Sequence, residues 1–157
     1  DVLGKAVEIM KQSGVPTGVG SHSLETPKRC ESDGVGADFY VKTFHMDRYW
    51  SATPEDRRVE YDWMKGNASD HNANNDSMWC NNPEETAAFM ETVDKPWVAF
   101  KVMAAGAINP RIAFSHAYRH GGDFIIAGMF DFQVVKNINM VNEILASLGN
   151  RKRVWFA

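Results

Sequence analysis

The sequence predicts an α/β domain built on a parallel sheet, and three observations lead to this prediction. Four short runs rich in β-branched and aromatic residues begin near residues 16, 38, 97 and 123. Helical patterns with recognisable start and stop residues lie between these runs. The runs are almost continuously apolar, which is typical of strands that are covered on both faces, as in parallel sheets.

The first part of the chain predicts helix, strand and helix in turn. Residues 1–13 carry apolar side chains at helical spacing and are followed by a glycine, so we expect an amphipathic helix there. A strand is expected at about 16–21. The next helix has two candidate starts, Ser23 and Thr26, and ends near residue 34; a start at Thr26 places a proline at the first helical position.

The rest of the chain alternates strands with helices. Asn82 and Asn109 each precede a proline, and this pairing is typical of an N-cap followed by the first helical residue. The expected elements are strand 38–44, helix 83–93, strand 96–107, helix 110–120, strand 123–130 and a final helix around 134–145.

The spacing of these units favours half of a barrel. Two of the three strand-to-strand spacings match one compact strand-helix repeat, and the middle one contains about 35 extra residues. Four units are too few to close an eight-stranded barrel, so we expect a single α/β domain or half-barrel fragment over 1–157, the C-terminal half of a (β/α)8 barrel. A small doubly wound, flavodoxin-like sheet is the alternative.

The composition is that of a globular protein without a nucleic-acid or membrane partner. Hydrophobic residues make up 44% and charged residues 24% of the 157 residues, which allows one domain with a sizeable core. The formal net charge of -3 provides no basic field for a phosphate backbone. The longest apolar stretch is too short to span a bilayer. Two cysteines without metal-finger spacing favour a reducing, cytoplasmic location.

A long insertion, residues 45–81, follows the second expected strand. It is polar and rich in Asn and Asp, yet it contains several Tyr and Trp side chains, whereas a disordered linker would have few rings. Because it leaves the carboxyl end of a strand, where α/β barrels do their chemistry, we interpret it as a lid or substrate-enclosing loop, with a surface ornament as the alternative. Its candidate substrate-binding residues are Asp47, Arg48, Tyr49 and Trp50, although Arg48 alternatively pairs with an acid inside the insertion.

Two lysines interrupt the apolar strands and are the main functional signal. Side chains alternate between the two faces of a strand, so if Val41 and Thr43 face the helices, Lys42 faces the interior. The same alternation places Lys101 inward on the following strand. A buried ammonium group must be paired, hydrated or partly deprotonated. Two neighbouring cations lower each other's pKa, which makes an amine nucleophilic; a buried acidic partner is the structural alternative.

The segments DFYVKTF, FKVMAAGAI and DFIIAGMF resemble the last three strands of class I deoxyribose-phosphate aldolases. This resemblance implies that Lys42 forms the imine with the substrate and that Lys101 lowers its pKa. It also implies that Gly106 and Gly128 lie where such barrels accept a substrate phosphate. Asp131 departs from the small residues of that family, and its carboxylate would repel a phosphate. The chain is also similar to an uncharacterised bacterial group of aldolase-type barrels, which implies a fold and no activity.

Histidines near the ends of the first two strands are candidate proton carriers. His22 and His45 can act as general acids or bases. With Asp47 they also indicate an alternative site, a divalent metal centre completed by residues of the insertion. The further candidate ligands are Asp70, His71 and Asp76. No local metal-binding signature is present, and histidines bonded to loop carbonyls are the structural alternative.

The sequence therefore predicts a small-molecule enzyme of the aldolase-type barrel class, with Schiff-base carbon–carbon lyase chemistry on a carbonyl substrate and no cofactor. The expected catalytic residues are Lys42, Lys101, His45 and His22. One alternative is a divalent-metal-dependent isomerase or hydrolase. Another is a non-catalytic half-barrel that joins a missing N-terminal half or a second copy, because its strand edges would otherwise stay unpaired.

Overall fold

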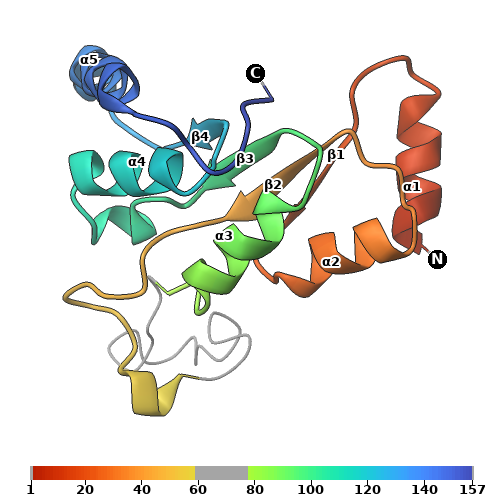
Figure 1. Ribbon diagram of the computed structural model, residues 1–157, viewed down its shortest axis with the longest axis horizontal. Coiled ribbons are helices and arrows are strands. Elements are labelled where there is room, and N and C mark those ends of the chain that lie inside the picture. The colour runs from red at the N-terminus through yellow and green to blue at the C-terminus, as the bar shows by residue number, and fades with distance from the viewer. Residues whose placement is uncertain (1, 59–77, 157) are drawn as a thin grey trace.

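The computed structural model is an α/β protein with five helices and a four-stranded sheet, and it describes residues 2–58 and 78–156 (Figure 1). None of the described helices combines the length and the apolar character that crossing a membrane requires. The elements are, in chain order, α1 (Val2–Lys11), β1 (Gly18–Ser21), α2 (Glu25–Ser32), β2 (Phe39–Thr43), α3 (Pro83–Glu91), β3 (Trp97–Phe100), α4 (Pro110–Arg119), β4 (Phe124–Ile126) and α5 (Asp131–Ser147).

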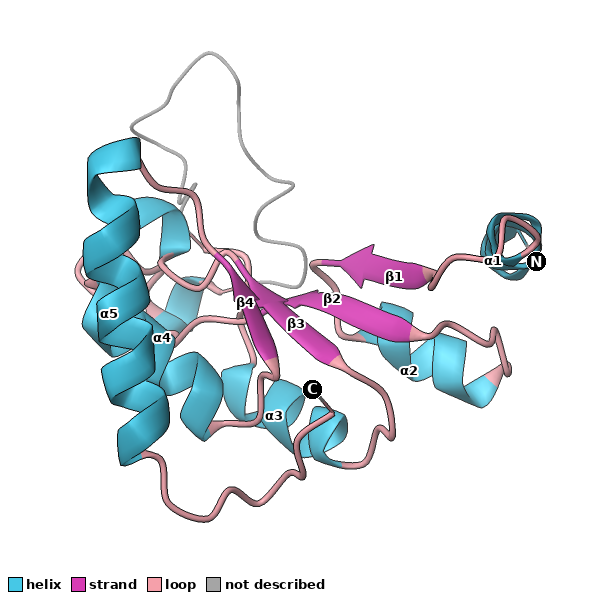
Figure 2. Cartoon of the chain, turned by 90° about the horizontal axis from the view of Figure 1, so that it is seen from above, coloured by secondary structure: helices cyan, strands magenta, loops and turns pink. Residues whose placement is uncertain are grey.

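The four strands are all parallel and follow one another across the sheet in chain order, β1-β2-β3-β4. This confirms the predicted fold class. The described sheet has no point at which the strand order reverses, and its parallel strands and helices are consistent with a half barrel or with a flavodoxin-like sheet. Helices α2, α3 and α4 lie on the same side of the sheet, and α1 stands beyond the β1 edge (Figure 2). The arrangement is the one expected for consecutive units of a half barrel.

Two helix starts predicted from an Asn-Pro pair are confirmed. Asn109 precedes α4, and its side-chain oxygen accepts a hydrogen bond of 3.0 Å from the backbone N–H of Arg111. Asn82 precedes α3, and its amide donates to the Glu85 carboxylate at 2.9 Å. Proline fits the first position of both helices because an N–H there has no intrahelical acceptor.

Helix α2 begins earlier than a cap at Thr26 would place it. The helix starts at Glu25, so Thr26 lies inside the first turn and Pro27 follows it. The Ser23 hydroxyl accepts a hydrogen bond of 3.2 Å from the backbone N–H of Glu25. Pro27 is tolerated because the first turn of a helix needs no backbone donor at that position.

The face of β2 that carries Tyr40, Lys42 and Phe44 lies against the helices, which is opposite to the predicted orientation. The Tyr40 hydroxyl donates to the Glu31 carboxylate of α2 at 2.5 Å. The Phe44 ring stacks on the His116 ring of α4, with centroids 4.8 Å apart. The orientation buries the largest rings, since Tyr40 and Phe44 are at most 1% exposed and Val41 stays only half-buried. Burying the larger apolar area is the more favourable choice.

The opposite face of the sheet is apolar and open. Val98 pairs with Phe124 and Phe100 with Ile126, so these four side chains share one face. Phe124 and Ile126 are 44% and 53% exposed. Within the described sheet, β1 and β4 each pair with one neighbour, so their outer backbone groups lie at edges.

The C-terminal tail closes the amino ends of β3 and β4. The Arg153 guanidinium, which is 4% exposed, pairs with the Asp123 carboxylate and donates to the Met90 carbonyl at 2.9 Å. Arg151 also pairs with Asp123, at 3.1 Å, and stacks on the Trp155 ring. Asp123 in turn accepts a hydrogen bond from the backbone N–H of Trp97 at 2.8 Å. The tail therefore ties the starts of two strands together.

Candidate active site

The chain leaves β3 in an unusual backbone conformation at Lys101. The strand ends at Phe100 rather than continuing through the predicted run to residue 107. Lys101, Ala104 and Ala105 have φ of 55°, 45° and 55°, in the left-handed region that is unfavourable for residues with a Cβ. A short 3-10 turn, Ala104–Gly106, follows. Such conformations cluster at functional sites, and this one takes Lys101 out of the alternation of the sheet.

A cleft of about 590 Å³ lies where β3 and β4 end and α5 begins. This volume is in the range of small-molecule sites. Its lining residues come from the turn after β3, the end of β4 and the first turns of α5: Phe100, Lys101, Val102, Met103, Ala105, Gly106, Ile108, Pro110, Ile126, Ala127, Gly128, Phe130, Gln133 and Asn137. The structure thus brings Lys101, Gly106 and Gly128 to one place.

The Lys101 ammonium group lies over the Trp79 indole. Its Nζ is 3.8 Å from the ring centroid. The face of an indole ring stabilises a positive charge at this distance. Trp79 belongs to the segment in which the insertion returns toward α3, so the insertion supplies one support of the cleft lysine.

His45 fixes that returning segment. Its Nε2 atom accepts hydrogen bonds from the backbone N–H groups of Trp79 and Cys80, at 3.1 and 3.0 Å. Its Nδ1 lies 2.8 Å from the Met46 carbonyl oxygen, so the ring proton sits on Nδ1 and is donated there. Burial lowers the pKa of His45 to about 4, which keeps the ring neutral. Both ring nitrogens are used by backbone groups, so His45 positions the loop under Lys101 rather than carrying protons.

Lys42 lies beneath the helices and outside the cleft lining. It is 1% exposed, and its Nζ donates to the Thr43 carbonyl at 2.7 Å. Burial lowers its pKa, and the nearby Cys80 partly opposes that change. The lowering therefore comes from desolvation, whereas the sequence predicted a neighbouring cation as its cause.

His22 stands beside the cleft. Its Nδ1 lies 2.6 Å from the Thr43 hydroxyl, and its ring stacks on Phe100 with centroids 5.4 Å apart. Phe100 is one of the cleft-lining residues. The pKa of His22 is lowered by burial first and then by the positive charges of Lys101 and Lys42. The lowered pKa keeps the His22 imidazole neutral at pH 7, which is the form that can accept a proton.

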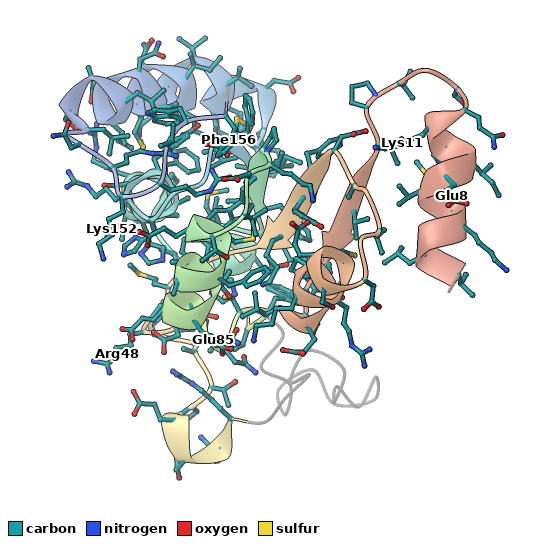
Figure 3. All side chains as sticks on the ribbon, turned by 45° about the vertical axis from the view of Figure 1, so that its right-hand side comes forward. Glu8, Lys11, Arg48, Glu85, Lys152 and Phe156 are labelled. Carbon is teal, nitrogen blue, oxygen red and sulfur yellow. The ribbon has the colours of Figure 1, made fainter. Side chains whose placement is uncertain are left out.

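The four candidate substrate-binding residues of the insertion do not line the cleft. Asp47 pairs with Arg58 at 2.6 Å. Arg48 pairs with Glu55 at 3.3 Å and projects away from the sheet (Figure 3). The remaining two contact other parts of the loop region: the Tyr49 hydroxyl donates to the Met78 sulfur, and the Trp50 indole donates to the Ala107 carbonyl. All four serve contacts within the protein.

A metal centre finds no support within the described residues. Asp70, His71 and Asp76 lie outside that part of the chain. Among residues 2–58 and 78–156, no group of three or more His, Cys, Asp or Glu side chains is arranged to hold a metal ion.

His116 and His120 are four residues apart near the end of one helix, and the sequence predicts that both face solvent; His120 is exposed, but His116 is half-buried. It packs on Phe44 between α4 and the sheet, and burial first and then His120 lower its pKa to about 4. Its Nε2 is buried and has no hydrogen-bond partner among the described residues.

Comparison of the chain with protein-family models, with curated proteins and with solved structures found no match.

Proposed function

We propose that this chain belongs to a small-molecule enzyme of the aldolase-type barrel class and acts on a carbonyl substrate through a Schiff base. The observation that carries the proposal is the Lys101 amine, the one charged group among the described residues that line a cleft at the carboxyl ends of parallel strands. This is the end at which α/β barrels do their chemistry. The left-handed backbone at Lys101 supports a functional role for that residue. The free thiols of Cys30 and Cys80 fit the cytoplasmic location that we expect.

Lys101, rather than Lys42, is the amine that meets the substrate. Lys101 lines the cleft, while Lys42 is covered by protein. In the proposed step the neutral His22 imidazole accepts a proton from the Lys101 ammonium, and the freed amine attacks the carbonyl carbon. The protonated His22 then returns this proton to the carbinolamine hydroxyl, which leaves as water and gives an iminium. Because the iminium keeps the positive charge of the ammonium, the Trp79 ring stabilises it as well.

Reductive trapping tests this proposal. The protein is incubated with glycolaldehyde or phenylacetaldehyde, reduced with borohydride and mapped by peptide mass spectrometry. We expect a stable adduct on Lys101, lost in Lys101→Met and kept in Lys42→Met and in the surface variant Lys152→Met. An adduct confined to Lys42 would show that Lys42 forms the imine, as the family resemblance implies. Labelling of all exposed lysines at one rate, or no adduct, would refute Schiff-base chemistry.

The role of His22 has its own test. Gln at position 22 keeps a polar side chain and cannot accept the proton, so His22→Gln is expected to slow adduct formation at neutral pH by about 10²-fold. The wild-type rate should fall as pH drops and the imidazole becomes protonated, whereas the variant should lose this part of the pH profile. An unchanged profile would assign the proton transfer to another group.

A second function, association through the open sheet face, is favoured by the exposed side chains of Phe124 and Ile126 and by the strand edges of β1 and β4. Apolar faces and unpaired edges are surfaces on which further strand-helix units pack. We expect a second copy of the chain to cover this face. Light scattering over a range of concentrations tests this, and a Phe124→Asp variant should shift the mass toward the monomer.

A further inference from the structure

We infer that the cleft beside Lys101 binds an apolar, unphosphorylated carbonyl compound. The inference rests on the proposed function, because it names the substrate class of the same site. It differs from the phosphate-bearing substrate that the family resemblance implies.

The walls of the cleft are mostly hydrocarbon. Aliphatic and aromatic side chains surround the cleft on the sheet side, the turn side and the α5 side: Phe100, Val102, Met103, Ile108, Ile126 and Phe130. Such a surface gains most from a ligand that buries apolar area against it.

Positive charge is too scarce for a phosphate. Lys101 is the only charged residue among the described residues that line the cleft, and it contacts the Trp79 ring. Tight phosphate sites use several charge-assisted donors, commonly with an Arg fork. Asp131 opens α5, so the positive end of that helix already faces a carboxylate. The two glycines that line the cleft therefore provide space rather than charge.

Two amides provide the remaining polar contacts. Gln133 and Asn137 are four residues apart on α5 and line the same side of the cleft. Part of each amide is engaged, because Gln133 accepts from the Phe130 N–H at 2.9 Å and Asn137 donates to the Met129 sulfur at 3.5 Å. The Gln133 NH₂ and the Asn137 oxygen are the atoms suited to a hydroxyl or carbonyl oxygen. The cleft thus fits an apolar body with one small oxygen-bearing end.

Calorimetric titration tests the ligand class without imine chemistry. The probes are 2-phenylethanol, which cannot form a Schiff base, and glycerol 3-phosphate. We expect 2-phenylethanol to bind at least tenfold more tightly. Ile126→Gln places a polar group in the wall and should weaken this binding about tenfold. Ile112→Gln is the matched control, since Ile112 on α4 is as exposed as Ile126, at 53%, and does not line the cleft.

Tighter binding of glycerol 3-phosphate, binding of neither probe, or equal weakening by both variants would overturn the inference. If 2-phenylethanol binds as expected but phenylacetaldehyde leaves no adduct on Lys101 after borohydride reduction, the ligand class stands and the Schiff-base proposal fails. The two proposals therefore fail by different results.

Discussion

The Arg153 guanidinium and the Asp123 carboxylate form an ion pair that is almost completely buried, with each residue 4% exposed. Arg153 also donates to backbone carbonyls that precede β3, at Met90, Val93 and Lys95. The desolvation of both charges is offset by this full set of hydrogen bonds.

Replacing Arg153 with Met should therefore destabilise the protein severely. The change removes a positive charge that pairs with the buried Asp123 carboxylate, and it removes the hydrogen bonds that Arg153 donates to backbone carbonyls. We therefore expect the free energy of unfolding to fall by about 3–5 kcal/mol. Urea denaturation followed by circular dichroism measures it. Lys152→Met, a change at an exposed neighbour, is the control and should stay within about 0.5 kcal/mol of wild type. Similar values for the two variants would show that the buried pair contributes little.

Stability should fall as pH drops from about 6.5 to 4. Burial lowers the pKa of His45 and of His116 from 6.5 to about 4 in the folded protein. Between these values the unfolded chain binds more protons than the folded one, so acid favours unfolding, by at most roughly 3 kcal/mol for each histidine. His45→Gln keeps an acceptor near the Nε2 position and cannot be protonated. It should flatten the pH profile, and a profile as steep as that of wild type would contradict this account.

Glycine at position 105 should stabilise the turn beside the cleft. Ala105 has φ of 55°, which costs a residue with a Cβ about 1–2 kcal/mol. Glycine removes this strain, but it also increases the conformational entropy of the unfolded chain, which offsets part of the effect. Ala105→Gly should therefore add about 0.5–1 kcal/mol to the free energy of unfolding. Ala146→Gly, on the exposed side of α5, should have the opposite sign. Destabilisation by both changes would argue against the left-handed conformation.

The contact between Lys101 and Trp79 should appear as a coupling energy. A double-mutant cycle measures this coupling energy from the free energies of unfolding of wild type, Lys101→Met, Trp79→Leu and the double variant. For an ammonium 3.8 Å from the ring centroid we expect about 0.5–1 kcal/mol. Additive effects of the two single changes would mean that the ring does not hold the amine in solution.

The fold class follows from the sequence because its signals are local. Asn109 before Pro110 marks the start of α4, and the apolar runs mark the strands. Local signals do not determine which face of β2 is buried. Tyr40, Lys42 and Phe44 alternate with Phe39, Val41 and Thr43, and both sets contain apolar residues, so the pattern leaves the buried face open. Tertiary packing decides it by covering the larger rings.

The sequence predicts only part of the candidate site, because the contacts that form the site also join residues far apart in the chain. Lys101 and Lys42 both stand out in the sequence as charges within apolar runs. Only Lys101 of the two lines the cleft, and it does so because the backbone turns at that residue. His45 stands out as an ionisable residue at a strand end. Its bonds to the N–H groups of Trp79 and Cys80 join positions 34 and 35 residues apart, which no local pattern indicates.

The chain-order succession of the strands has a consequence for how the protein is made. Because each new strand pairs with the one synthesised before it, the sheet can grow from β1 toward β4 as the polypeptide leaves the ribosome. Arg153 follows β4 and α5 in the chain, so it emerges after all four strands, and its partner carboxylate, Asp123, lies just before β4. Nascent chains halted before residue 153 should therefore contain a formed sheet that lacks the buried ion pair, and the emergence of Arg153 should coincide with a gain in the stability of that sheet.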